Sequence, residues 1–333
     1  MEFGSRNANV NFSTNGDNFF NLPFTGIASF MKTEICPSLD ALEPGYDVAI
    51  LGFPFDVGAS ARSGARFGPR GVRDASTVYC DGLYGLYDPV RNVEYLDQGE
   101  RIIDCGDVDV SPCGFEQSFE NCEAAVRCII DSGAVPVVIG GDHSTTIPVV
   151  RALDRYDDVC IIQFDAHLDW TDSYGEFTCS HSSPMRRSSE LAHVGKMMQI
   201  GLRGLGSSGP ADFAEARAWG STIVSAPELR REGMEAIIAR IPDAEHYYIT
   251  VDIDGLDPSL CPGTGSPQPG GLLYEEVNDL VYAVVKKGDV VGFDVSEVAP
   301  PYDHADQTSL YAAQIILDFI CFYTKKRSQG YLE

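Results

Sequence analysis

Short apolar runs of strand length alternate along the chain with longer segments in which apolar residues recur every three or four positions. Both patterns are diagnostic, because strands repeat every two residues and helices every 3.6. The runs predict strands at 47–53, 101–105, 135–141, 159–164, 196–201, 221–224, 247–252 and 289–295. The helical pattern predicts helices at 115–132, 210–219, 226–240, 273–287 and 307–323.

This alternation is typical of βαβ units, which build a parallel sheet covered by helices. We therefore expect an α/β fold with a single three-layer domain, a mostly parallel sheet of roughly eight strands, and helices on both faces. Residues 34–333 contain no linker or repeat and should form that one domain. Residues 1–33 are polar and aperiodic and should be an N-terminal arm that packs on the body or on a neighbouring subunit. Residues 1–5 have the composition of a cloning remnant.

The overall charge narrows the range of partners. The net charge of −25 argues against nucleic acid, whose phosphates an acidic protein repels. It favours a cationic small molecule, although an acidic surface also serves solubility alone. No apolar run reaches the 18 residues of a membrane span, and the N-terminus lacks the pattern of a signal peptide. Ten cysteines without a CxxC pair indicate reduced thiols, so we expect a cytoplasmic protein.

Two clusters of carboxylates and imidazoles stand out against this background. Asp165, His167 and Asp169 follow the apolar run 159–164, and Asp252 and Asp254 follow 247–251. Residues at i, i+2 and i+4 share one side of a strand, so each cluster should point one way if its strand continues. Several carboxylates at the end of buried strands are very unfavourable without a cation. One divalent metal ion, or a pair of them, resolves the conflict.

A third piece supplies another imidazole. The run 135–141 ends in Gly-Gly and is followed by Asp142 and His143. Open α/β sheets place their ligands at the carboxyl ends of strands, so His143 should join the same site. Mixed nitrogen and oxygen ligands suit Mn²⁺, Ni²⁺, Co²⁺ or Zn²⁺ better than Ca²⁺ or Mg²⁺.

The order of these motifs strongly resembles that of the ureohydrolases, the family of arginase, agmatinase and guanidinobutyrase. The match begins near Tyr46 and reaches the C-terminus. It includes Gly-Gly-Asp-His-Ser at 140–144, Phe-Asp-Ala-His-Leu-Asp at 164–169, His181, Asp-Ile-Asp-Gly-Leu-Asp-Pro at 252–258, Pro-Gly-Thr-Gly-Ser-Pro at 262–267 and Glu297. The resemblance implies an arginase/deacetylase-like fold, a homotrimer or homohexamer, and hydrolysis of a guanidino compound to urea and an amine.

The resemblance also implies two divalent metal ions, Mn²⁺ first and Ni²⁺ as the alternative. One ion would be held by His143, Asp165, Asp169 and Asp252, and the other by Asp165, His167, Asp252 and Asp254. Two such cations lower the pKa of a bridging water, which then attacks the guanidinium carbon. Asp257 matches a position that is not usually a ligand.

Three residues are implied in catalysis. Asp169 is the candidate to relay a proton to the leaving amine. Glu297 matches the carboxylate that hydrogen-bonds the guanidinium, and His181 matches an acid/base or substrate-orienting histidine. Ser182 follows this histidine where many relatives have glycine, which puts the backbone of the loop in doubt.

The substrate is predicted from the segment that follows the metal motif. Residues 170–176 contain Trp170 and Glu176 but no Arg or Lys, which disfavours a substrate with a free carboxylate. Agmatine is therefore the favoured substrate, with guanidinobutyrate, guanidine, alkylguanidines and biguanides as alternatives. Trp170 either narrows the pocket or packs in the core. Ser266, in the 262–267 motif, is a further candidate for substrate binding.

Two other classes of protein remain open. A deacetylase-like amidohydrolase shares the metal architecture but fits Glu297 and the segment 252–267 less well. A non-catalytic subunit that supports an active partner is disfavoured because all six ligands, His181 and Glu297 are present.

Overall fold

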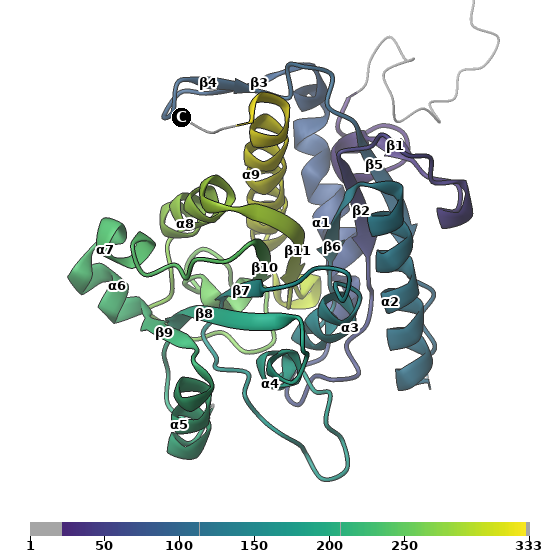
Figure 1. The fold of residues 1–333 in the computed structure, drawn as a ribbon. Coiled ribbons are helices and arrows are strands. Elements are labelled where there is room, and N and C mark those ends of the chain that lie inside the picture. The colour runs from purple at the N-terminus through teal and green to yellow at the C-terminus, as the bar shows by residue number, and fades with distance from the viewer. Residues whose placement is uncertain (1–21, 113, 207, 331–333) are drawn as a thin grey trace, which may run out of the picture.

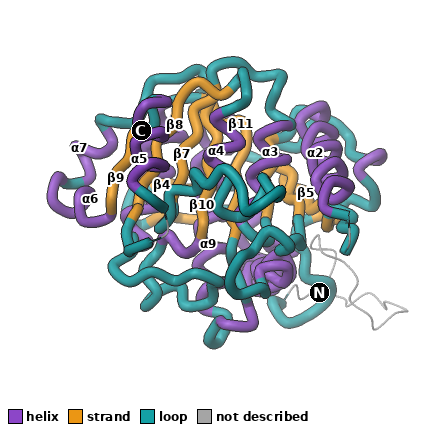
Figure 2. Tube along the Cα trace, turned by 90° about the horizontal axis from the view of Figure 1, so that it is seen from below, coloured by secondary structure: helices purple, strands orange, loops and turns teal. Residues whose placement is uncertain are grey.

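The computed structural model describes residues 22–112, 114–206 and 208–330. Within this part of the chain, nine strands form one sheet in the order β1-β5-β2-β6-β11-β10-β7-β8-β9, and every neighbouring pair is parallel. The strands are β1 (Glu34–Ile35), β2 (Val48–Gly52), β5 (Ile102–Asp107), β6 (Val135–Ile139), β7 (Val159–Phe164), β8 (Val194–Leu202), β9 (Thr222–Ser225), β10 (His246–Asp252) and β11 (Asp289–Ser296). Figure 2 shows them side by side across the middle of the molecule. A separate antiparallel hairpin joins β3 (Leu86–Asp88) to β4 (Val93–Tyr95).

Helices cover both faces of the sheet (Figure 1). One face is covered by α1 (Gly68–Ser76), α6 (Ala226–Glu232), α7 (Met234–Ile238), α8 (Tyr274–Lys287) and α9 (Gln307–Gln329). The other face is covered by α2 (Phe115–Ser132), α3 (Thr146–Arg151), α4 (Pro184–Ser189) and α5 (Pro210–Trp219). Side chains alternate between the two cores, as β2 illustrates: Val48 and Ile50 enter the first, and Ala49 and Leu51 the second.

The predicted fold class is confirmed, and so are most of the predicted elements. The helices expected at 115–132 and 210–219 have those bounds in the structure. The strand expected at 159–164 is also found with the same bounds. Helix α2 ends where the sequence turns to Gly133, whose φ of 88° is a left-handed conformation that favours glycine.

Several elements differ from the prediction, and the short helices α3 and α4 were not predicted. The single helix expected at 226–240 is two short helices, because Gly233 at φ 89° ends α6 and starts α7. The sheet gains a ninth strand at its edge, the two-residue β1, which is too short to carry a hydrophobic pattern. The β3–β4 hairpin was also not predicted, because its strands are only three residues long and partly exposed.

The predicted N-terminal arm lies mostly outside the described residues. Its last part is described and packs on the body. The Phe30–Lys32 turn is buried, the backbone N–H of Phe30 donates to Asp104 Oδ2 at 2.8 Å, and that of Met31 donates to Ser76 Oγ at 2.8 Å. A contact of the arm with a neighbouring subunit stays a prediction. In the described part of the chain, no helix is long and apolar enough to span a bilayer.

Candidate active site

The predicted site residues follow four neighbouring strands at the centre of the sheet, β6, β11, β10 and β7. His143 opens a 3₁₀ turn (His143–Thr145) after β6, and Glu297 directly follows β11. Asp252 ends β10, and Asp254 lies in the 3₁₀ turn Ile253–Gly255. Asp165, His167 and Asp169 follow β7. Because parallel strands end at the same edge, residues more than 100 positions apart in the chain meet there.

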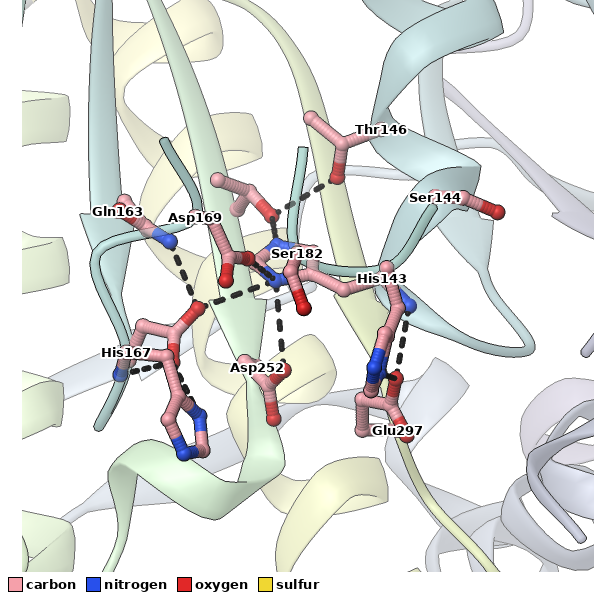
Figure 3. A network of polar contacts seen from close by, with 12 residues as sticks. His143, Ser144, Thr146, Gln163, His167, Asp169, Ser182, Asp252 and Glu297 are labelled. Carbon is pink, nitrogen blue, oxygen red and sulfur yellow. Dashed lines mark hydrogen bonds and ion pairs between the residues drawn. The ribbon is translucent and has the colours of Figure 1, made fainter. Parts of the chain in front are cut away.

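The four aspartates and two histidines form one compact cluster, and Figure 3 shows His143, His167, Asp169 and Asp252 within it. His143 Nδ1 lies 3.0 Å from Asp165 Oδ2, 2.7 Å from Asp169 Oδ2 and 3.3 Å from Asp252 Oδ2. His167 Nδ1 lies 3.0 Å from Asp254 Oδ2 and 3.4 Å from Asp165 Oδ1. Asp165 therefore contacts both histidines and joins the two halves of the cluster.

Turns after the strands, and not continuous strands, bring these side chains together. Strand β7 ends at Phe164, and Asp169 has a left-handed φ of 53°. Glu297 has a φ of 62°. Such conformations are costly for residues other than glycine and are commonly held in place at functional sites. These side chains face one another as predicted. However, turns after the strands bring them together, and not the alternation of a continued strand.

Close packing also requires glycine behind the cluster. A Cβ at Gly141 would lie 1.7 Å from the carbonyl oxygen of Phe55, and one at Gly255 would lie 2.9 Å from the backbone nitrogen of Asp165. Both contacts are with backbone that cannot move aside. The glycines of the Gly-Gly-Asp-His and Asp-Ile-Asp-Gly motifs therefore allow the turns to reach the site.

A buried polar network fixes the orientation of His143. Its Nε2 lies 2.9 Å from Thr250 Oγ1, and the Thr250 hydroxyl donates to Asp294 Oδ1 at 2.9 Å. Asp294 also accepts from Thr146 Oγ1 at 2.9 Å and from the hydroxyl of Tyr248. These contacts leave Nδ1 of His143 directed at the carboxylates. Histidines that bind metal ions are commonly oriented by such a partner on the other ring nitrogen.

The electrostatics show an excess of buried negative charge. Burial alone would lower the pKa of His167, but the charge of Asp254 and the contact with Asp165 raise it to about 12. Burial also works against protonation of His143, yet Asp165, Asp169 and Asp252 raise its pKa well above the ordinary value. The pKa of Asp252 is raised well above its usual range by burial and by Asp254 and Asp165. The cluster therefore attracts positive charge strongly.

The residues present fit divalent metal ions. His143, Asp165 and Asp252 offer ligand atoms within 4.8 Å of one another, and so do Asp165, His167 and Asp254. Ligand atoms around an ion bound at about 2.0–2.2 Å lie about 3 Å apart, as the contacts of the cluster do. His143 Nδ1 and Asp169 Oδ2 are buried and lie 2.7 Å apart, but they form no hydrogen bond of acceptable geometry, and a shared cation would supply the missing partner.

A cavity of about 490 Å³ opens above the cluster. Its floor includes His167, Asp169, Asp252 and Asp254. Its walls come from four other segments and are rich in hydroxyl groups: Ser60, Ala61, Arg62, Tyr174, His181, Ser182, Leu205, Gly206, Ser208, Gly265, Ser266, Pro267 and Gln268. A volume of this size is in the range of small-molecule sites.

His181 and Glu297 lie together at this wall. His181 Nδ1 is 3.1 Å from Glu297 Oε1, and the same oxygen accepts from the backbone N–H of His143 at 3.0 Å. Glu297 is buried behind His181 and does not line the cavity, while Ser266 does. Although Ser182 stands where a glycine was expected after His181, His181 lines the cavity.

Two of the predicted substrate contacts lie elsewhere. Trp170 is only 2% exposed and packs in the core near Trp219, with ring centroids 6.1 Å apart. Glu176 is exposed and does not line the cavity. Trp170 instead belongs to the core on the face of the sheet covered by α2, α3, α4 and α5, where its large apolar ring is removed from water. Tyr174 is the residue of the 170–176 segment that lines it.

Residues on both sides of the cluster were not predicted from the sequence. Ser60 and Arg62, from the loop after β2, line the cavity. The Gly/Arg-rich composition of that loop, together with its place at a strand end, was a usable signal. Thr250 and Asp294 lie inside buried strands, and a polar residue within an otherwise apolar strand was the available signal for them.

Comparisons with known proteins agree with this geometry. A model of the arginase family matches residues 46–321. A guanidinopropionase from Pseudomonas aeruginosa is 34% identical over 92% of this chain and 95% of its own length. An agmatinase from Bacillus anthracis is 32% identical over 84% of this chain and 92% of its own length.

Solved structures agree as well. The proclavaminate amidino hydrolase of Streptomyces clavuligerus superposes with a TM-score of 0.78 at 30% identity, covering 91% of this chain and 99% of that one. The predicted resemblance is therefore confirmed. The chain belongs to the arginase family of metal-dependent hydrolases, which cleave guanidino C–N bonds to give urea and an amine.

Proposed function

We propose that this protein hydrolyses a guanidino compound with the help of two divalent metal ions, Mn²⁺ first and Ni²⁺ as the alternative. The observation that carries this proposal is the cluster of six ligands at the floor of a cavity that also presents His181. His143, Asp165, Asp169 and Asp252 would hold one ion, and Asp165, His167, Asp252 and Asp254 the other. When bound, the ions would supply a hydroxide nucleophile at neutral pH for attack on the guanidinium carbon.

The residues around the ions have separate roles in this proposal. Asp169 belongs to the cluster and lies on the cavity floor, where it would relay a proton to the leaving amine. His181 presents its imidazole at the cavity wall, and Glu297 orients that ring from behind through the 3.1 Å contact with Nδ1. Ser182 and Ser266 offer hydroxyl and backbone groups to the planar guanidinium.

The cavity wall supports a substrate whose tail carries no ammonium group. Within the described lining, the only carboxylates are those of predicted metal ligands, so a second cation would find no partner. Arg62, whose Nε and Nη2 donate to the carbonyls of Gly265 and Thr264, adds positive charge. We infer a neutral guanidine or an ω-guanidino acid as the substrate.

Agmatine is the second candidate. The sequence favoured it because residues 170–176 are acidic, but Glu176 is outside the lining and Asp172 pairs with Arg187 at 2.6 Å. The net charge of −25 still favours a cationic substrate at long range.

A urea-release assay tests the reaction and the substrate together. The purified chain, reconstituted with Mn²⁺ or Ni²⁺, would be offered guanidine, methylguanidine, 3-guanidinopropionate, 4-guanidinobutyrate, agmatine and arginine. We expect urea from the neutral or acidic guanidines and poor turnover of arginine. Release of urea from none of the panel with either metal would contradict the proposed reaction.

Assembly remains a separate proposal. We infer a homotrimer or homohexamer from the family alone, and sedimentation at micromolar concentration measures it. A mass near the 36.2 kDa of one chain would contradict it.

A further inference from the structure

The loop after β2 encloses the imidazole of His181. The backbone N–H of His181 donates to the carbonyl of Gly58 at 3.1 Å. On the ring, Nε2 lies 2.8 Å from Ser60 Oγ and 3.2 Å from the backbone nitrogen of Ser60. The other ring nitrogen, Nδ1, faces Glu297 Oε1 at 3.1 Å. Both nitrogens of the ring are therefore engaged, one by a carboxylate and one by Ser60.

The two sides of the ring impose different conditions on its protons. An ionised carboxylate only accepts hydrogen bonds, so Glu297 requires a proton on Nδ1. A backbone amide only donates, so the N–H of Ser60 suits a bare Nε2 and hence a neutral ring. A hydroxyl can donate to a bare nitrogen or accept from a protonated one. The Ser60 hydroxyl is thus the one partner of Nε2 that suits both forms of His181.

Negative charge around His181 makes the protonated form accessible. The ionisable groups that face it are Glu297 after β11, Asp142 after β6 and Asp169 after β7. Burial lowers the pKa of His181, but Glu297, Asp142 and Asp169 together raise it to about 9. In that protonated state the Ser60 amide opposes the Nε2 proton, and the Ser60 hydroxyl can accept it.

We propose that Ser60 is a positioning residue that holds the imidazole of His181 in place whether or not Nε2 carries a proton. The inference rests on the proposed guanidine hydrolysis, in which His181 acts at the cavity wall. Ser60 does not need to contact the substrate for this role. It keeps one ring orientation, with Nδ1 on Glu297, while Nε2 changes between donor and acceptor.

Three variants test the proposal. Ser60→Ala removes the hydroxyl and leaves the backbone amide, Ser60→Thr keeps a hydroxyl, and Ser63→Ala is a matched control three residues along the same exposed loop. We expect Ser60→Ala to lower kcat roughly tenfold with KM changed less than about twofold, the loss of one hydrogen bond to a charged group. Ser60→Thr should restore most of kcat, and Ser63→Ala should leave kcat and KM unchanged.

A second readout follows the ring itself and does not depend on turnover. The imidazole of His181 is titrated by NMR in each variant and assigned with a His181→Asn sample. Without the hydroxyl, only the amide donor remains at Nε2, so the pKa of His181 should fall in Ser60→Ala. It should stay near the wild-type value in Ser60→Thr and Ser63→Ala.

The outcomes separate this inference from the proposed function. If the wild type releases urea but Ser60→Ala matches it in both kcat and the titration of His181, the positioning role is wrong. A loss of kcat in Ser60→Ala with an unchanged His181 titration also contradicts it, because the hydroxyl would then act on the substrate. If no guanidine is hydrolysed by the wild type, the proposed function fails, and the titration alone decides about Ser60.

Discussion

The two histidines of the cluster lie in different surroundings. The side chain of His143 is 1% exposed, and both its ring nitrogens face protein, the carboxylates on one side and Thr250 on the other. The side chain of His167 is 17% exposed and lines the cavity. The core thus buries the imidazole of His143, whereas the imidazole of His167 opens to the cavity, whose floor also includes Asp169 and Asp252.

Removal of either histidine should abolish metal binding at one position and most turnover, but the loss of stability should differ between His143 and His167. We expect both His143→Ala and His167→Ala to reduce bound metal from about two ions per chain to about one and to abolish most turnover. In the metal-free protein, His143→Ala should also cost stability, about 3–5 kcal/mol, because it leaves buried carboxylates without their imidazole. His167→Ala should cost clearly less. Metal analysis and denaturant unfolding measure the two effects, and equal losses of stability would contradict the difference between the two histidines.

The buried network behind His143 offers a subtler change. Asp294→Asn keeps the shape but weakens the hold on Thr250, so we expect one of the two metal-binding events to weaken about 10–100-fold. Isothermal titration with Mn²⁺ resolves this. Tyr248→Phe is the matched control, since its hydroxyl reaches the same carboxylate of Asp294 without touching Thr250. A larger effect in the control than in Asp294→Asn would refute the network.

Trp170 and Tyr174 extend the comparison of core and cavity to the segment after the cluster. Trp170→Ala should destabilise the protein by about 3–5 kcal/mol, as loss of a buried aromatic does, with the ranking of guanidines unchanged. Tyr174→Ala should do the reverse, because Tyr174 is half-exposed at the cavity wall. Thermal unfolding and KM across the guanidine panel distinguish them. A changed ranking in a folded Trp170 variant would show that Trp170 reaches the substrate.

The smallest effect is expected at Asp257, a carboxylate of the same motif that lies outside the cluster. Burial is the largest single influence on its pKa and raises it, but the hydrogen bonds from Ser259, Gly271 and Gly270 together outweigh burial and lower the pKa to about 2. Because the folded pKa lies below the unfolded one, this carboxylate stabilises the fold above about pH 4, and the contribution is lost as the pH falls towards 2. Asp257→Asn should lower Tm modestly at pH 7, and the difference from wild type should shrink at acid pH. A difference that grows on acidification would contradict this assignment.

How well each element was predicted depends on how much of a hydrophobic pattern its residues show. Helix α2 was predicted with its bounds because a long apolar pattern and a terminal glycine define it, and strand β7 because a compact, mostly apolar run defines it. Strand β1 was missed because two residues carry no period, and α6 and α7 were merged because the apolar pattern continues across Gly233. These errors affect single elements and leave the predicted fold class unchanged.

The cluster itself was predicted residue by residue because metal ligands must be His and Asp near strand ends. The walls of the cavity were not. Ser60, Arg62 and Gln268 come from loops whose meeting depends on tertiary packing, and Trp170 packs in the core near Trp219. For an apolar residue next to a site motif, no sequence pattern indicates whether its side chain faces the core or the cavity.

The central claim is that the six residues bind two divalent ions that support guanidine hydrolysis. It is tested most directly by metal analysis of the reconstituted wild-type chain, measured in parallel with urea release as metal is added. We predict that urea release reaches its maximum only as the content approaches two ions per chain. Full activity at one ion per chain, or in protein stripped of metal, would contradict the account.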